Sequence, residues 1–177
     1  MDPELRVPTA LFLQLGAMLI LACLAASCVS PGETEVALRA DQMEGFVLVK
    51  EGSGVWQLET RSIECPAQTW KHTAIGMILD IRWVLLHSPD QARASSRTAG
   101  MWLAVNWDAG SYSDQTLGDM CWFPPDLTGE RSFAGIAFCR GRFGVAVIGH
   151  VKEGHVDTLL VEEVARRLLQ NIDGAGQ

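Results

Sequence analysis

The sequence has a single tyrosine and four histidines, and it lacks the short motifs that mark common metal and catalytic sites. No CxxC, HxxxH or HExxH spacing occurs, which excludes the usual sequence forms of a zinc site. The GxSxG, SxxK, GxGxxG and P-loop patterns are absent too, so neither a serine nucleophile nor a phosphate-binding loop is indicated. We therefore expect no metal, no cofactor and no enzymatic activity.

Clustered positive charge is missing as well. The chain has 14 basic and 21 acidic residues, which gives a net charge of −7 at neutral pH, and like charges never form a long block. Nucleic-acid binding depends on groups of Lys and Arg that neutralise phosphates. The charge balance therefore excludes a general nucleic-acid partner.

The N-terminus contains one long apolar run. This run covers residues 10–26, is interrupted only by Gln14, and is followed by Ser27 and Cys28. A run of this length is typical of a signal peptide or a short membrane anchor. Its end, Leu24-Ala-Ala-Ser-Cys28, resembles the lipobox of bacterial lipoproteins, and the resemblance implies that Cys28 is lipidated. An uncleaved anchor and simple cleavage are the alternatives, and in each case the rest of the chain is exported.

These features predict three segments in the chain. A signal peptide or membrane anchor covers residues 1–28, a polar tether covers 29–43, and a single domain covers 44–177. We expect the protein to be exported and held on the extracytoplasmic side of the membrane by its N-terminal lipid or anchor.

Local patterns within the domain predict strands and two helices. Residues 75–87 alternate between apolar and polar, which is typical of a strand with one buried face. Ser88-Pro-Asp predicts a helix start, with an end near Gly100, and residues 101–107 either extend this helix or form a strand. Residues 157–171 carry apolar side chains at four-residue steps, which predicts a second helix with Asp157 or Thr158 as its cap. Residues 132–150 predict a β-hairpin with a tight turn at Arg140-Gly141.

The first part of the domain is less regular. Phe46–Lys50 predicts a short strand and Gly52–Gly54 a turn, while the proline in Cys65–Lys71 favours a connection. Strands with helices between and after them predict an α+β fold, with an antiparallel sheet and helices packed on one face. The predicted N-terminal signal or anchor helix precedes this domain.

The C-terminal half of the chain resembles a known group of domains. The segments that carry the resemblance are Leu117-Gly-Asp119, Ser132-Phe133, the run from Phe138 to Val147 and the final helix. They are similar to extracytoplasmic sensor-like domains of bacterial lipoproteins and receptor-kinase ectodomains, and to the PsbP-like fold. This resemblance implies a binding or assembly domain of the bacterial cell envelope without catalytic activity.

Three cysteines remain beyond the N-terminal run: Cys65, Cys121 and Cys139. In an oxidising compartment an odd number of cysteines suggests one disulfide and one thiol. Cys121 and Cys139 lie in neighbouring predicted strands, so they are the preferred pair. The alternative is that all three are small buried apolar residues.

Six tryptophans accompany the single tyrosine. Trp102, Trp107 and Trp122 lie within 21 residues of one another, next to a polar loop, and they are candidates for a platform that binds a glycan or an apolar ligand. The alternative is that these side chains fill the core.

We therefore predict a non-enzymatic lipoprotein domain that binds an envelope protein or a ligand, in sensing or assembly. The alternatives are a carrier of lipid or another apolar ligand and, less favoured, a cell-wall hydrolase with an unrecognised site. A deep apolar cavity would favour the carrier, whereas a filled core with a flat exposed aromatic patch would favour the partner-binding domain.

Overall fold

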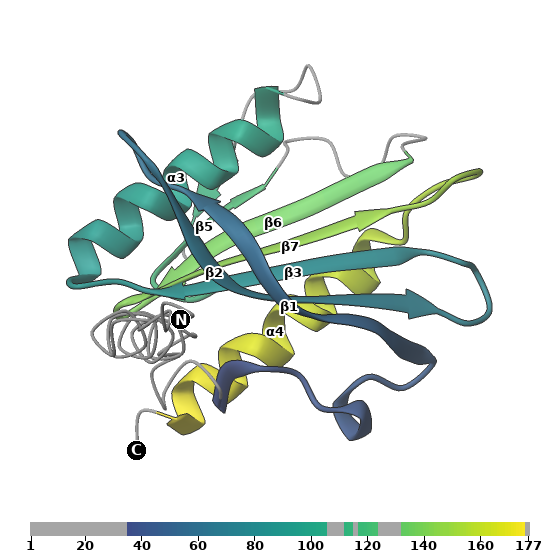
Figure 1. The fold of residues 1–177 in the computed structure, drawn as a ribbon. Helices are drawn as coiled ribbons and strands as arrows, with labels where there is room; N and C mark the ends of the chain where they lie inside the picture. The colour runs from purple at the N-terminus through teal and green to yellow at the C-terminus, as the bar shows by residue number, and fades with distance from the viewer. Residues whose placement is uncertain (1–34, 106–111, 115–116, 124–131, 176–177) are drawn as a thin grey trace, which may run out of the picture. The chain divides into compact units, whose positions relative to one another are not determined.

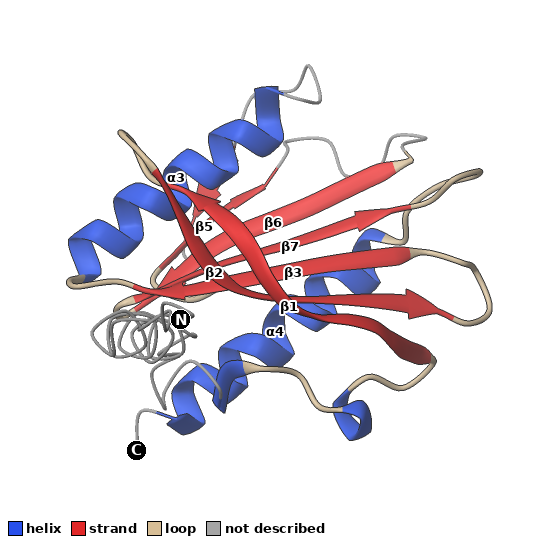
Figure 2. Cartoon of the chain, viewed as in Figure 1, coloured by secondary structure: helices blue, strands red, loops and turns tan. Residues whose placement is uncertain are grey.

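A computed structural model describes residues 35–105, 112–114, 117–123 and 132–175, without the side chains of 102–105 and 112–114. The predicted N-terminal signal or anchor helix and Cys28 lie outside these residues. Helices and strands are distributed along the chain as Figures 1 and 2 show. In chain order they are η1 (Ala40–Gln42), β1 (Phe46–Gln57), β2 (Ser62–His72), β3 (Ile78–Leu85), α3 (Pro89–Val105), β4 (Tyr112–Asp114), β5 (Met120–Phe123), β6 (Phe133–Arg140), β7 (Phe143–His150) and α4 (Thr158–Ala175).

The strands of the described residues form one sheet in the order β1-β2-β3-β7-β6-β5-β4. Every neighbouring pair is antiparallel. This confirms the predicted α+β class and the antiparallel sheet.

The predicted hairpin lies in the middle of the sheet as β6 and β7. Phe138 pairs with Val145, and Arg140 pairs with Phe143, so the turn consists of Gly141 and Arg142, one position later than predicted. Gly141 has a φ of +54°, a value that glycine adopts without steric cost. Six successive residues in each of the two strands are buried, so both faces of the sheet are covered here.

The prediction that the helices pack on one face is wrong, because α3 and α4 cover opposite faces of the sheet. Successive strand residues point to alternate faces. On β7, a Cβ at Gly149 would contact Val161 of α4, whereas a Cβ at Gly144 would contact Ser96 of α3. These two glycines are five residues apart in one strand, which puts their Cβ directions on opposite sides. In Figure 1 the two helices accordingly lie on either side of the central strands.

Both helices begin where capping residues were predicted. Ser88 Oγ accepts a hydrogen bond from the backbone N–H of Gln91 (3.2 Å), and Asp157 Oδ1 accepts hydrogen bonds from the N–H groups of Leu159 (3.0 Å) and Leu160 (3.2 Å). The first helix continues past its predicted end near Gly100 to Val105, so of the two alternatives for the following residues the extended helix is the one observed.

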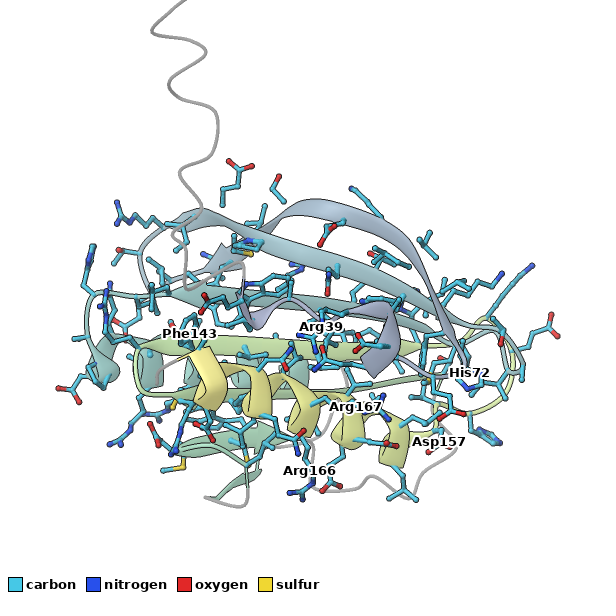
Figure 3. All side chains as sticks on the ribbon, turned by 90° about the horizontal axis from the view of Figure 1, so that it is seen from below. Arg39, His72, Phe143, Asp157, Arg166 and Arg167 are labelled. Atoms are coloured by element: carbon cyan, nitrogen blue, oxygen red, sulfur yellow. The ribbon has the colours of Figure 1, made fainter. Side chains whose placement is uncertain are left out.

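Helix α4 contributes five buried side chains to the core on its side of the sheet. It also carries two ion pairs at i,i+4, Glu162 with Arg166 and Glu163 with Arg167. Figure 3 labels the two arginines along this helix. Its buried residues are Val161, Val164, Ala165, Leu168 and Ile172, which confirms the predicted helical stripe.

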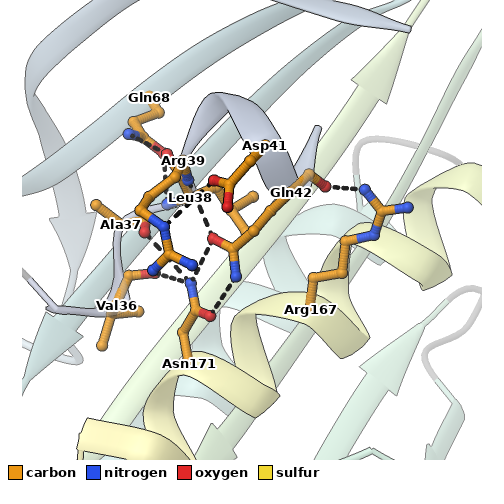
Figure 4. Close-up of polar contacts among 9 residues, drawn as sticks. All are labelled: Val36, Ala37, Leu38, Arg39, Asp41, Gln42, Gln68, Arg167 and Asn171. Carbon is orange, nitrogen blue, oxygen red and sulfur yellow. Dashed lines mark hydrogen bonds and ion pairs between the residues drawn. The ribbon is translucent and has the colours of Figure 1, made fainter. Parts of the chain in front are cut away.

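The predicted tether is wrong in its second half, because the folded domain begins before residue 44. Val36, Leu38 and Met43 are at most 3% exposed and belong to the core between the sheet and α4. Hydrogen bonds fix this segment at both sides, as Figure 4 shows. Asn171 Nδ2 donates to the carbonyls of Val36 (3.2 Å) and Ala37 (3.3 Å), and Gln68 bonds both backbone groups of Leu38.

Strand β1 is longer than predicted. Gly52 and Gly54 continue it instead of forming a turn, and the expected connection at residues 65–71 is part of β2. Pro66 is tolerated because it lies outside the stretch of β2 that pairs with β3, so it has a neighbouring strand on one side only.

Candidate functional site

The face of the sheet that α3 covers is made of unusually small residues. Gly54, Ala67, Gly144 and Ala146 all lie on this face, in strands β1, β2 and β7. The helix offers small residues in return, namely Ala92, Ser95, Ser96, Ala99 and Gly100. Short side chains allow a helix to approach a sheet closely, but they cannot fill the space where the two surfaces separate.

The helix touches the sheet most closely near its middle. A Cβ on Gly144 would lie 2.9 Å from Ser96 Oγ and 3.0 Å from Trp56 Cζ2, so only glycine fits there. The buried Ser96 hydroxyl donates a hydrogen bond to the carbonyl of Phe138 (3.0 Å). One turn further on, a Cβ on Gly100 would lie 2.3 Å from Trp122 Cβ.

Beyond these close contacts, a cavity of about 300 Å³ opens between α3, β1, β3 and β7. Its size falls within the range of about 300–1,000 Å³ that is common for small-molecule sites. The walls are mostly apolar. Its described lining residues are Val55, Trp56, Gln57, Arg82, Ala99, Ala146 and Ile148.

Trp56 forms an aromatic wall of this cavity and is 2% exposed. Among the described residues, its indole Nε1 is the buried side-chain polar atom left without a hydrogen-bond partner. The equally buried Trp70 differs, since its Nε1 donates to Gln68 Oε1 (3.3 Å). An unpaired buried donor costs about 1–3 kcal/mol, so this indole N–H lowers the stability of the domain.

Arg82 is the charged residue of the cavity wall. Its Nη1 donates to the carbonyl of Val55 (2.9 Å), and its Nε lies 3.4 Å from the position of a Cβ on Gly54. The side chain therefore lies over the glycine-containing part of β1. Arg82 also lines a second, polar recess of about 150 Å³, together with residues that include Lys50, Thr69 and Asp80.

The predicted aromatic platform is wrong for Trp122. That side chain is 6% exposed and packs on Gly100 of α3, where it fills the core. The side chain of Trp102 and the whole of Trp107 lie outside the described residues.

The predicted disulfide between Cys121 and Cys139 is wrong, and these two cysteines are not bonded to each other. Cys121 pairs with Phe138 in the ladder between β5 and β6, so its side chain points to the α4 face, while the next residue of β6, Cys139, points to the α3 face. The alternative of three buried thiols describes what is observed, since Cys65 is buried too.

The thiol of Cys139 is not suited to be a nucleophile. Burial raises its pKa, and the nearby carboxylate of Asp119 raises this pKa further. A raised pKa keeps the thiol protonated at neutral pH, whereas the thiolate is the reactive form. No chemistry is therefore indicated at this position.

Within the described part of the chain, no three His, Cys, Asp or Glu side chains are grouped so that they could hold a metal ion. No helix among the same residues is long and apolar enough to cross a membrane.

Sequence reasoning missed the residues that form the cavity, above all Trp56, Arg82 and Ala99. A signal was present in Ala137, Gly144 and Ala146, which alternate with large apolar residues in β6 and β7. Their small size marks a second packed face, but it does not indicate which helix covers that face or where space is left.

The chain was also compared with known proteins. No family model, no curated protein and no solved structure matches it.

Proposed function

We propose that this chain is a non-enzymatic, exported binding domain that holds a small apolar ligand between α3 and the sheet. The cavity of about 300 Å³ is the observation that carries the proposal. Its walls are mostly apolar, which favours the carrier over the partner-binding domain. Trp122 is buried and so is not part of an exposed aromatic patch, which also favours the carrier.

The small residues that line the cavity on both sides support a role in binding. Protein interiors are packed closely, and replacing small residues by larger ones is the simple route to filling a void. Here both walls have small residues, Ala99 on α3 and Ala146 on β7, next to a tryptophan whose indole N–H is unpaired. An apolar ligand in the cavity would contact both of these walls.

Replacing Ala99 by phenylalanine is expected to abolish ligand binding, because the larger side chain would occupy the cavity that Ala99 lines. The probe is N-phenyl-1-naphthylamine, an uncharged aromatic amine that fluoresces in apolar surroundings. We expect the wild-type full chain to raise its fluorescence above that of the Ala99→Phe variant by at least about fivefold, if each wild-type molecule takes up one probe.

Ala94→Phe is the matched control, because it makes the same change on the same helix at a residue that is not part of the cavity wall. All proteins are measured in the same detergent, so uptake of the probe by micelles is common to them. Equal fluorescence for the wild type and the Ala99→Phe variant would contradict the proposed function.

We further propose that the domain is anchored through Cys28 on the extracytoplasmic side of the membrane. The support is the apolar run of residues 10–26 and its lipobox-like end. Mass spectrometry of the protein isolated from membranes is expected to find an acylated Cys28 at the N-terminus. An unmodified Cys28 within an intact N-terminal segment would refute this anchor.

A further inference from the structure

We propose that the ligand is an anionic amphiphile, with its apolar part in the cavity and its negatively charged head at Arg82. This inference rests on the proposed function and adds the chemical class of the ligand. Two adjoining spaces of opposite character carry it, the apolar cavity and the polar recess, and Arg82 is the residue that lines both.

The guanidinium group of Arg82 has donors to spare for a ligand. It carries five N–H groups, and one of them is used by the carbonyl of Val55. Within the described part of the chain, Arg82 forms no ion pair with a carboxylate. Arginine recognises carboxylates and phosphates through paired N–H groups, so an anion is the partner that suits this site.

Of the charged residues around the recess, Arg82 is the one placed to bind the anionic head group. Asp80 also lies in the recess, but its carboxylate accepts a hydrogen bond from the Thr69 hydroxyl (2.7 Å) and lies 3.8 Å from Nδ1 of His150. Lys50 adds a second positive charge to the wall of the recess. A head group that approached from the cavity would reach Arg82 first, since Asp80 and Lys50 are not part of the cavity wall.

The register of the sheet explains why Arg82 can serve both spaces. Arg82 pairs with Ala67 of β2 and with Ala146 of β7, so small residues flank it on both neighbouring strands. Gly54 of β1 leaves room beside its Nε. The long side chain therefore has open space on the cavity side and on the recess side, while its position is fixed by the bond to Val55.

Trp56 supports a ligand with a hydrogen-bond acceptor. It lines the same cavity, and its buried indole N–H has no partner. A hydrocarbon alone would leave this donor unpaired, whereas a ligand with an oxygen near its head offers an acceptor.

The test compares decanoate with 1-decanol, two probes with equal chain lengths that differ in head-group charge. Each probe is used to displace N-phenyl-1-naphthylamine from the full chain. The concentration of decanoate that displaces half of the dye is divided by the corresponding concentration of decanol. Arg82→Gln removes the positive charge and is expected to weaken decanoate about tenfold relative to decanol, as loss of a charge-assisted hydrogen bond predicts. The probes also enter detergent micelles, but they do so equally for every protein in the same detergent. This effect therefore cancels when the ratio is compared between proteins.

Arg97→Gln is the matched control, because Arg97 is an exposed arginine of α3 that is not in the cavity wall. This variant is expected to keep the wild-type ratio. An unchanged ratio in folded Arg82→Gln would overturn the inference while leaving the proposed function intact. Failure of both probes to displace the dye from the wild type would overturn both.

A second measurement needs no variant. Added salt screens the attraction between the head group and Arg82, so on the wild-type protein it should raise the half-maximal concentration of decanoate more than that of decanol. Equal salt dependence of the two probes would contradict the inference even if Arg82→Gln did not fold.

Discussion

Replacing Gln68 by methionine is expected to lower the free energy of unfolding by about 3 kcal/mol, since two buried backbone groups would lose their partner. Gln68 is 3% exposed, and its side chain forms hydrogen bonds to both the N–H (3.0 Å) and the carbonyl (3.1 Å) of Leu38. Methionine has a similar volume, so the loss measures the hydrogen bonds more than a cavity. Urea denaturation followed by circular dichroism gives the free energy.

Part of the lost free energy of unfolding is expected to come from weaker attachment of the N-terminal segment, residues 36–43, to the domain. Gln68 also accepts the indole N–H of Trp70, so one amide connects β2, the buried Leu38 and a core tryptophan. Gln57→Met is the matched control, because Gln57 is exposed and bonded to the Ser62 hydroxyl at the surface. A cost for Gln68→Met that is no larger than the cost for Gln57→Met would show that residues 36–43 contribute little to the fold.

Replacing Gly100 by alanine is expected to destabilise the domain by about 2 kcal/mol, because the added methyl group overpacks the contact between α3 and β5. Its Cβ would lie 2.3 Å from Cβ and 2.8 Å from Cγ of Trp122, atoms close to the β5 backbone that cannot swing away. This loss exceeds the gain of about 0.5–1 kcal/mol that alanine normally brings to a helix. The same denaturation experiment measures it.

The same change on α4, Gly174→Ala, is expected to stabilise the domain instead of destabilising it. Nothing lies within 4 Å of a Cβ at this helical position, so the alanine should stabilise the helix by up to about 1 kcal/mol. If both variants were stabilised, the close packing of α3 on Trp122 would be refuted, and with it the geometry that leaves the cavity open.

The most accurate sequence predictions came from local signals. Ser88 and Asp157 cap the helices as expected, because a capping side chain bonds N–H groups two or three residues along the same chain. The stripe of α4 was correct for a related reason, and so was the alternation of β3, although this strand covers Ile78–Leu85 and not the predicted residues 75–87. A regular period in the sequence repeats the geometry of one element, and it does not depend on the rest of the fold.

Predictions that depended on contacts between distant segments failed. The disulfide between Cys121 and Cys139 required both side chains to share a face, but the register of β5 on β6 puts them on opposite faces. The prediction of a tether depended on the polar residues at its start. Val36 and Leu38 further along are instead buried between α4 and the sheet.

The sequence by itself determined the class of this domain, because hydrophobic periods and capping residues specify strands and helices locally. Only the tertiary structure decided that α3 and α4 lie on opposite faces, and that Trp56, Arg82 and Ala99 meet around one cavity. The physical reason is that a cavity is the volume left between surfaces brought together by strand order and register. Residues from four elements, β1, β3, α3 and β7, form its walls, and no local pattern records how closely those elements approach.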